Sequence, residues 1–306
     1  KKYYEYYYLK KRIDITSGHI NLLQQLESSA RTGYKGGSLP YSHIVNIQVE
    51  LARLEDRRTS LKALRPAVSS ALARTVNLSD ATELPWPGKL SDKELDLKDS
   101  RIVKLIREHN PKLKEVDASV EKYETVKKLA GRQYYPDITL GASYMETGEA
   151  VMPGQDDSGK DPVGIILSLN IPMWRGKYRS GVREAERKMD AALRKGEEFE
   201  NRLIALLRMA LYRYRDAFRK INLYRETLLP KARQAFQASR KSFETGKSGL
   251  MEVIDAERSM LEFELQLEHS FVLKLENVAL IEKIVGYDLS LTGKEAKKND
   301  KEYRRE

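Results

Sequence analysis

The segment from Tyr134 to Tyr178 constrains the fold most, because it has the pattern of two strands set between long stretches of helical pattern. Apolar side chains alternate with small or polar ones along both arms, which is typical of a strand with one apolar face. The apolar positions are Ile138, Leu140, Ala142 and Tyr144 in the first arm and Val163, Ile165, Leu167, Leu169, Ile171 and Met173 in the second. We therefore predict a β-hairpin over residues 134–177, in which Ile166 alone breaks the alternation.

The length of the arms suits a membrane crossing. Each arm has about ten to twelve residues, or roughly 33 to 40 Å of strand, which is enough to cross a bilayer core when tilted. Antiparallel pairing would bring Tyr134 and Tyr135 to the same end as Trp174 and Tyr178, where such rings form membrane-interface girdles. A polar loop over residues 147–161 joins the other end. A soluble hairpin is the alternative, but two isolated strands are only marginally stable in water.

Composition favours long exposed helices around this hairpin. Charged residues make up 33% of the 306 residues and the mean hydropathy is -0.59, so the chain must bury narrow apolar stripes. The net charge is +10, but Lys and Arg are interspersed with Asp and Glu, so we expect solvated helix faces and no nucleic acid. There is no cysteine, which excludes disulfides and thiolate chemistry. No apolar run approaches the ~20 residues of a transmembrane helix, so any membrane crossing is expected to be by strands.

After the hairpin, apolar residues recur three and four apart, which predicts one continuous helix over residues 178–229, roughly 75 Å long at 1.5 Å per residue. Pro230 interrupts this pattern and predicts a kink or junction. A turn over 244–249 and a helix over 250–285 should complete a helical hairpin. The predicted buried positions of the long helix are Val182, Ala185, Met189, Ala192, Gly196, Phe199, Leu203, Leu206, Ala210, Tyr214, Ala217, Ile221, Tyr224 and Leu228.

The part before the β-hairpin repeats the helical theme. Residues 1–80 read as a helical hairpin with a turn over 33–40, and residues 81–97, rich in Asp, Pro and Gly, as a linker. A helix over 98–133, bent or restarted at Asn110-Pro111, should lead into the first strand.

The two ends of the sequence have their own signals. Residues 287–306 form a charged tail without apolar periodicity, which we expect to be disordered. The sequence starts with Lys1, already in a helical pattern, so we expect the true N-terminus to have been removed.

An internal duplication is also predicted. A constant offset of 209 residues aligns the two helix–turn–helix segments without a gap, although their identity is low. The matched pairs are Tyr34 with Phe243, Gly37 with Gly246, Arg31 with Arg240, Glu55 with Glu264 and Val76 with Val285.

Three stretches resemble the TolC-type outer-membrane channel family. YYPDITLGASY is similar to the helix-to-strand transition of that family, LSLNIPMWRGKYRSGVREAE to its strand-to-helix transition, and SFETGKSGLMEVIDAE to its periplasmic tip. The resemblance implies a mainly α fold with a transmembrane β-hairpin. In the family, a trimer closes one β-barrel in the outer membrane, and its long helices form an α-barrel tunnel below it.

By this comparison, residues 1–80 correspond to the later part of the first family repeat and residues 98–286 to the second, with its long helices over 178–286 and its tip near 243–255. Family members contribute twice as many strands per protomer as one hairpin. We therefore expect the leading helix and strand pair of the first repeat to lie outside this sequence.

The resemblance also implies pore-entrance residues. Glu252 and Asp255 fall where the family has acidic residues that narrow the tunnel and favour cations, and His43 and Asn46 are their counterparts in the first repeat. Residues three apart share a helix face, so threefold symmetry would surround a pore with carboxylates. Two ordinary surface acids are the alternative. Ser248 stands where some members have a basic gating residue, which argues against a family-style salt-bridge lock.

Gly37 and Gly246 are expected to permit turn conformations that other residues resist. In the family, such turns contact the adaptor protein.

The function implied by the resemblance is that of a passive exit duct in a tripartite efflux or type I secretion system. It would be a homotrimer in the bacterial outer membrane, in contact with outer-membrane lipid, extending into the periplasm, with a periplasmic adaptor and an inner-membrane pump of the RND or ABC type as partners. A drug, a metal ion or a protein remains open as substrate, and the strand-to-helix motif leans towards cation-efflux relatives. The competing hypothesis is a soluble coiled-coil scaffold or a protein that binds membrane surfaces.

Catalysis has no positive support in the sequence. Gly246-Lys247-Ser248 resembles the end of a phosphate-binding loop, but Lys241 occupies the place of its first glycine. The four histidines are scattered without a metal-ligand spacing, and surface or seam positions explain them better. We predict a protein that is not an enzyme and has no cofactor or metal site.

Overall fold

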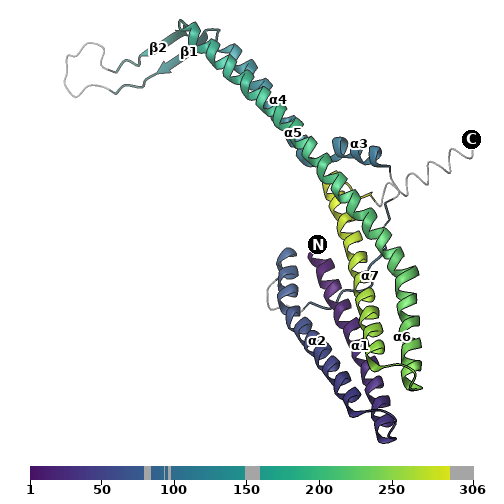
Figure 1. The fold of residues 1–306 in the computed structure, drawn as a ribbon. Coiled ribbons are helices and arrows are strands. Elements are labelled where there is room, and N and C mark those ends of the chain that lie inside the picture. The colour runs from purple at the N-terminus through teal and green to yellow at the C-terminus, as the bar shows by residue number, and fades with distance from the viewer. Residues whose placement is uncertain (79–83, 93, 96–97, 149–158, 290–306) are drawn as a thin grey trace, which may run out of the picture. The chain divides into compact units, whose positions relative to one another are not determined.

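The computed structural model of the chain describes residues 1–78, 84–92, 94–95, 98–148 and 159–289 (Figure 1). Most of the predicted tail and of the polar loop lies outside the described residues. The described elements are α1 (Lys2–Lys35), α2 (Tyr41–Thr75), α3 (Asp99–His109), α4 (Pro111–Arg132), β1 (Asp137–Tyr144), β2 (Val163–Asn170), α5 (Arg175–Asn222), the π-helical turn η1 (Leu223–Leu228), α6 (Leu229–Glu244) and α7 (Leu250–Val285). They fall into two compact units, one of residues 1–109 with 203 onwards, the other of residues 110–202.

In the first unit, α1, α2, α6 and α7 share one apolar core. Each helix contributes side chains three or four residues apart, so that one stripe per helix turns inward. Ile20 and Leu23 of α1 pack in this core with Ile47 of α2, Phe236 of α6 and Val253 of α7, all buried. The two predicted helical hairpins are therefore confirmed.

The predicted long helix is confirmed in outline and wrong in two details. It does not run unbroken to residue 229, because a π-helical turn separates α5 from α6 just before Pro230. Proline has no N–H for the helix and its ring crowds the preceding turn, which a wider turn accommodates. In addition, Leu206 is 51% exposed, whereas Leu207 is 1% exposed. Either residue fits a spacing of three and four between Leu203 and Ala210, and the core lies on the side of Leu207.

The restart at Asn110-Pro111 is confirmed. The Oδ1 atom of Asn110 accepts hydrogen bonds from the backbone N–H groups of Lys112 (2.9 Å) and Leu113 (3.1 Å), which caps α4. Pro111 occupies the first turn of α4, where a missing N–H costs nothing.

Part of the predicted linker packs on the first unit. Trp86 stacks on Tyr6 of α1, with 4.8 Å between ring centroids, and the guanidinium of Arg65 from α2 lies 4.5 Å from the Trp86 ring. The hydroxyl of Tyr6 donates to the Leu84 carbonyl at 2.8 Å. This segment therefore ties α1 to α2.

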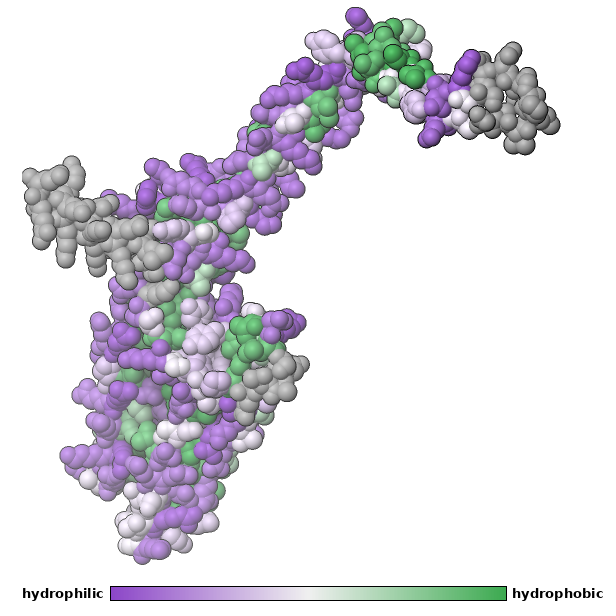
Figure 2. Space-filling model, turned by 180° about the vertical axis from the view of Figure 1, so that it is seen from behind, coloured by the Kyte–Doolittle hydropathy of each residue, from purple (hydrophilic) through white to green (hydrophobic). Residues whose placement is uncertain are grey.

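The β-hairpin of the second unit is antiparallel, as predicted. Ile138 pairs with Leu169 and Leu140 with Leu167, so the apolar positions of both strands lie on one face. Figure 2 shows this apolar surface over β1 and β2. Each strand has 8 residues, fewer than predicted. Prolines flank the paired residues: Pro136 directly precedes β1, Pro162 directly precedes β2, and Pro172 lies two residues after β2. Ile171 and Met173 consequently lie beyond β2.

No described helix is both long and apolar enough to span a membrane.

The packing of α4 against α5 depends on Gly196. A Cβ atom at this position would lie 2.6 Å from Cγ1 of Val116, closer than carbon atoms approach, whereas a Cβ atom at Gly181 would meet no atom within 4 Å. We expect Gly196→Ala to lower stability by about 1 to 3 kcal/mol through overpacking. Gly181→Ala, the matched control, should raise it by about 1 kcal/mol through helix propensity. Thermal melts followed by circular dichroism measure both, and equal shifts of the same sign would contradict this account.

Candidate functional site

The turns that join α1 to α2 and α6 to α7 are alike in their backbone. Three backbone hydrogen bonds of the first turn recur in the second at the predicted offset of 209 residues. In the first turn, the N–H groups of Gly36, Gly37 and Ser38 donate to the carbonyls of Thr32 (3.1 Å), Tyr34 (3.0 Å) and Gly33 (2.9 Å). In the second, those of Thr245, Gly246 and Lys247 donate to Lys241 (3.1 Å), Phe243 (3.0 Å) and Ser242 (2.8 Å). Gly37 has φ of 73° and Gly246 of 69°, a conformation that side chains disfavour. The matched turns are confirmed, and duplication of the chain stays a prediction.

The predicted acidic pair lies beside the second of these turns. Glu252 and Asp255 are both exposed on the first turns of α7, where the helix dipole favours negative charge. Asp255 Oδ1 lies 3.6 Å from Nη1 of Arg258, on the same helix. Ser248 in the turn donates a hydrogen bond from its hydroxyl to the Ser239 carbonyl at 3.4 Å.

The counterparts on α2 differ from each other. Asn46 is exposed. The ring of His43 instead lies against Phe243, with 5.5 Å between centroids, and its Nδ1 atom is buried with no hydrogen-bond partner in the described part of the chain. Among the described residues, His43 makes no ion pair with Glu252 or Asp255, and Asn46 carries no charge.

A buried polar network crosses the core above the tip. His19 of α1 is 2% exposed and sits between two carboxylates of α7, with Nδ1 2.6 Å from Glu257 Oε1 and Nε2 3.3 Å from Glu264 Oε2. Arg233 of α6 approaches the other oxygen of Glu264 at 2.9 Å. Both ring nitrogens therefore face acceptors, which calls for the doubly protonated imidazolium.

The charge of His19 follows from these partners. Burial by itself would lower its pKa, but the hydrogen bonds to Glu257 and Glu264 outweigh burial and raise the pKa to about 9. The hydrogen bond from His19 in turn lowers the pKa of Glu264. Glu257 is fully buried and its Oε2 has no hydrogen-bond partner among the described residues, so its contact with His19 is made through Oε1.

A second ion pair ties α2 to α7 nearer the tip. Glu50 is 4% exposed and accepts hydrogen bonds from Arg258 at Oε1 (3.2 Å) and Oε2 (2.6 Å). Arg53 approaches the same carboxylate at 3.5 Å. The hydrogen bond from Arg258 lowers the pKa of Glu50 against the opposing effect of burial. The two helical hairpins are thus joined by charged contacts as well as by their apolar core.

In the second unit, the four predicted interface aromatics lie at the open end of the β-hairpin. The rings of Tyr134 and Tyr178 are in contact, with 5.9 Å between centroids. Tyr135 and Trp174 are exposed. Antiparallel strand pairing thus brings Tyr134, before β1, next to Tyr178, after β2.

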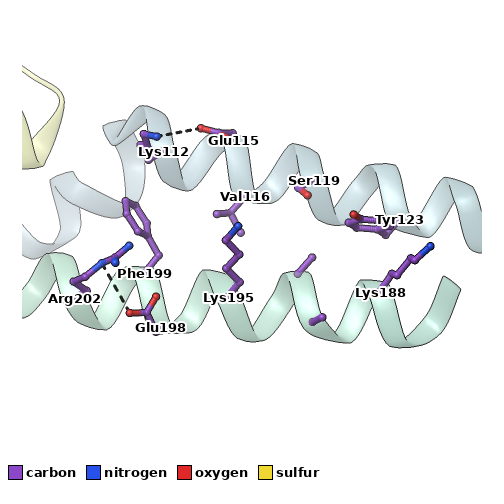
Figure 3. A pocket seen from close by; sticks show the side chains of 12 residues that line it. Lys112, Glu115, Val116, Ser119, Tyr123, Lys188, Lys195, Glu198, Phe199 and Arg202 are labelled. Carbon is purple, nitrogen blue, oxygen red and sulfur yellow. Dashed lines mark ion pairs between the residues drawn. The ribbon is translucent and has the colours of Figure 1, made fainter. Parts of the chain in front are cut away.

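A groove of about 410 Å³ lies between α4 and α5 (Figure 3). Two ion pairs lie along the flanking helices, Lys112 with Glu115 and Arg202 with Glu198, both at 3.9 Å. The lining also contains Val116, Ser119 and Phe199.

The comparison that decides the family covers more than half of the sequence. A model of the outer membrane efflux protein family matches residues 102–270. The chain belongs to the outer membrane efflux protein family. Because this is a family of outer-membrane channels and not of enzymes, the prediction that the chain is not an enzyme is confirmed.

One curated relative of this outer membrane efflux protein is the cobalt-zinc-cadmium resistance protein CzcC of Cupriavidus metallidurans. It is 24% identical over 250 residues, which are 79% of this chain and 54% of the relative. The chain thus spans about half the length of the relative that it matches.

Solved structures show the same fold. The outer-membrane channel OprN matches with a TM-score of 0.79 at 15% identity, over 94% of this chain and 65% of that one. VceC from Vibrio cholerae matches with a TM-score of 0.77 at 17% identity (94% and 68%), and CusC with 0.78 at 14% identity (94% and 66%).

The buried network was missed by sequence reasoning, which placed the four histidines at surface or seam positions. A signal was present, because Glu257 and Glu264 lie seven residues apart, two turns along the apolar stripe of α7. Only the packing of α1 on α7 shows that His19 lies between them.

The network predicts a pH dependence of stability. His19 has a folded pKa of about 9 against an ordinary value of 6.5, so its contribution is complete below about pH 6.5 and is lost as the pH rises through 9. A shift of this size corresponds to about 3 kcal/mol. The melting temperature should therefore fall between pH 6.5 and 9, and His19→Gln should melt lower at pH 6 and lose this dependence. The control His109→Gln, at a half-exposed position, should keep it, and an unchanged profile in His19→Gln would contradict the assignment.

Proposed function

We propose that the chain is part of an outer-membrane exit duct that conducts solutes passively from the periplasm. The observation that supports this most is the apolar face of the hairpin. Leu140 and Ile165 are 75% and 79% exposed, and five further side chains of that face share their exposure: Ile138, Tyr144, Val163, Leu167 and Leu169. A patch of this kind is unfavourable in water and favourable in lipid.

The opposite face of the hairpin suits the inside of a channel. It consists of small or polar residues apart from Ile166, among them Thr139, Ser143 and Ser168. A two-stranded hairpin leaves one edge of each strand unpaired, and lipid has no water to satisfy those backbone groups. Strands from other copies would pair these edges in a trimeric β-barrel, with the long helices as the wall of an α-barrel below.

The domain assignment forms part of this proposal. Residues 1–80 are the later part of the first repeat, 98–133 lead to the membrane, 134–177 cross it, and 178–286 are the long helices of the second repeat. The aromatic rings at the open end of the hairpin mark a membrane interface.

At the tip, Glu252 and Asp255 act as the cation-favouring entrance, because both are exposed on one face of α7. Asn46 and His43 occupy the corresponding places on α2, and the turns with Gly37, Gly246 and Ser248 contact a periplasmic adaptor. An RND or ABC pump in the inner membrane supplies the energy. Cations are the favoured cargo, which the name of the curated relative supports.

Conductance in planar bilayers tests this function. The full-length protein, extracted from outer membranes in detergent, should be a trimer with cation-selective conductance. Removal of a carboxylate that acts at about 4 Å through water removes about 1 kcal/mol, so Glu252→Gln with Asp255→Asn should lower the cation preference about fivefold or more.

Glu121→Gln with Glu124→Gln, which removes two exposed acids from α4, is the charge-matched control and should leave selectivity unchanged. A protein that stays soluble without detergent and shows no conductance would overturn the duct in favour of the helical scaffold. Conductance with unaltered selectivity in the tip variant would retain the duct and reject the entrance residues.

A further inference from the structure

A groove of about 850 Å³ runs between α1, α2 and α7 in the first unit. Four arginines line it, and two of them, Arg12 of α1 and Arg57 of α2, are half-buried. Among the described residues, neither makes an ion pair with a carboxylate. A charge that is partly removed from water gains from a partner of opposite sign.

Aromatic neighbours hold Arg12 in place without neutralising it. The guanidinium of Arg12 lies 5.7 Å from the centroid of the Tyr8 ring, and that ring contacts the ring of His269 at 5.3 Å. The Tyr8 hydroxyl donates to the Leu265 carbonyl at 3.5 Å. These two tilted rings flank Arg12 and supply no negative charge at neutral pH.

Acidic residues on the groove do not compensate these charges. Glu50 is occupied by Arg258 and Arg53, as described above. Asp56 and Glu262 also line the groove, and both are exposed and make no ion pair with Arg12 or Arg57.

The electrostatics of Arg57 agree with this geometry. Its pKa is lowered by burial first, then by the positive charge of Arg12, with a smaller contribution of the same sign from Arg53, while Tyr8 opposes them. Burial near other cations disfavours the charged form of Arg57 unless an anion is bound.

We propose that Arg12 and Arg57 form a binding site for a small oxyanion with two negative charges, of the phosphate type. Two guanidinium groups from facing helices can each donate a pair of N–H groups to its oxygens. The pocket is open to water, so exchange would be fast and the affinity moderate. Occupancy would fasten α1 and α2 on the side that faces α7. Neither Arg12 nor Arg57 belongs to the proposed cation entrance at the tip.

Isothermal titration of the full-length protein in detergent with inorganic phosphate, in a buffer without other oxyanions, tests the site. We expect saturable binding that Arg57→Gln and Arg12→Gln each weaken about tenfold or more, since a charged hydrogen bond is worth more than one power of ten. Arg57→Lys should keep part of the affinity, because an ammonium lacks the planar fork. Arg58→Gln removes the same charge from the next position on α2, outside the groove, and should bind as the parent does.

A second measurement guards against variants that fold poorly. Phosphate should raise the melting temperature of the parent and of Arg58→Gln, but not of Arg57→Gln. Absence of saturable binding to the parent, or binding that neither arginine variant weakens, would overturn the site. Both results are separable from conduction, because a channel without phosphate binding would still conduct.

Discussion

One apolar core holds two helical hairpins together, and the arrangement of the helical tip follows from it. The core takes one narrow stripe from each of α1, α2, α6 and α7, in a chain of which a third is charged. Long helices with so little apolar surface cannot be stable alone, since most helical stability in proteins comes from packing of an apolar face. The matched turns and the exposed acids near them therefore have fixed places only because Phe243, Leu250 and their neighbours are buried beneath them.

Charged groups inside this core add selectivity of packing as well as stability. The imidazolium of His19 lies between two carboxylates, and Glu50 receives two hydrogen bonds from Arg258. The hydrogen bonds of His19 outweigh the cost of its burial, and a shifted register of α1 against α7 would leave the carboxylates unpaired. The apolar stripe alone would tolerate a slip by one heptad, and the polar contacts do not.

Local rules were enough to predict the hairpin and the bounds of the last helix. Alternation fixed which side of β1 and β2 is apolar, and the residues 250–285 expected for α7 are those observed. The features that could not be predicted either depend on tertiary packing or allow more than one local arrangement. Leu206 and Leu207 satisfy the same spacing, the extent of strand pairing depended on the flanking prolines, and the place of His19 required knowledge of which face of α1 meets α7. The tip residues were predicted by resemblance, and the structure adds that His43 and Asn46, though three apart, have different surroundings.

The π-helical turn before Pro230 has a consequence for how the long helix can change. Each residue advances an α-helix by about 100°, since 3.6 residues make a turn, so one inserted residue would rotate everything downstream away from its partners. A turn closed by i→i+5 hydrogen bonds takes up such a residue locally. The π-helical stretch 223–228 therefore changes the rotation of α6 relative to α5 about the helix axis. The apolar stripes of the two helices can then each face their own neighbours, although they do not follow one continuous repeat.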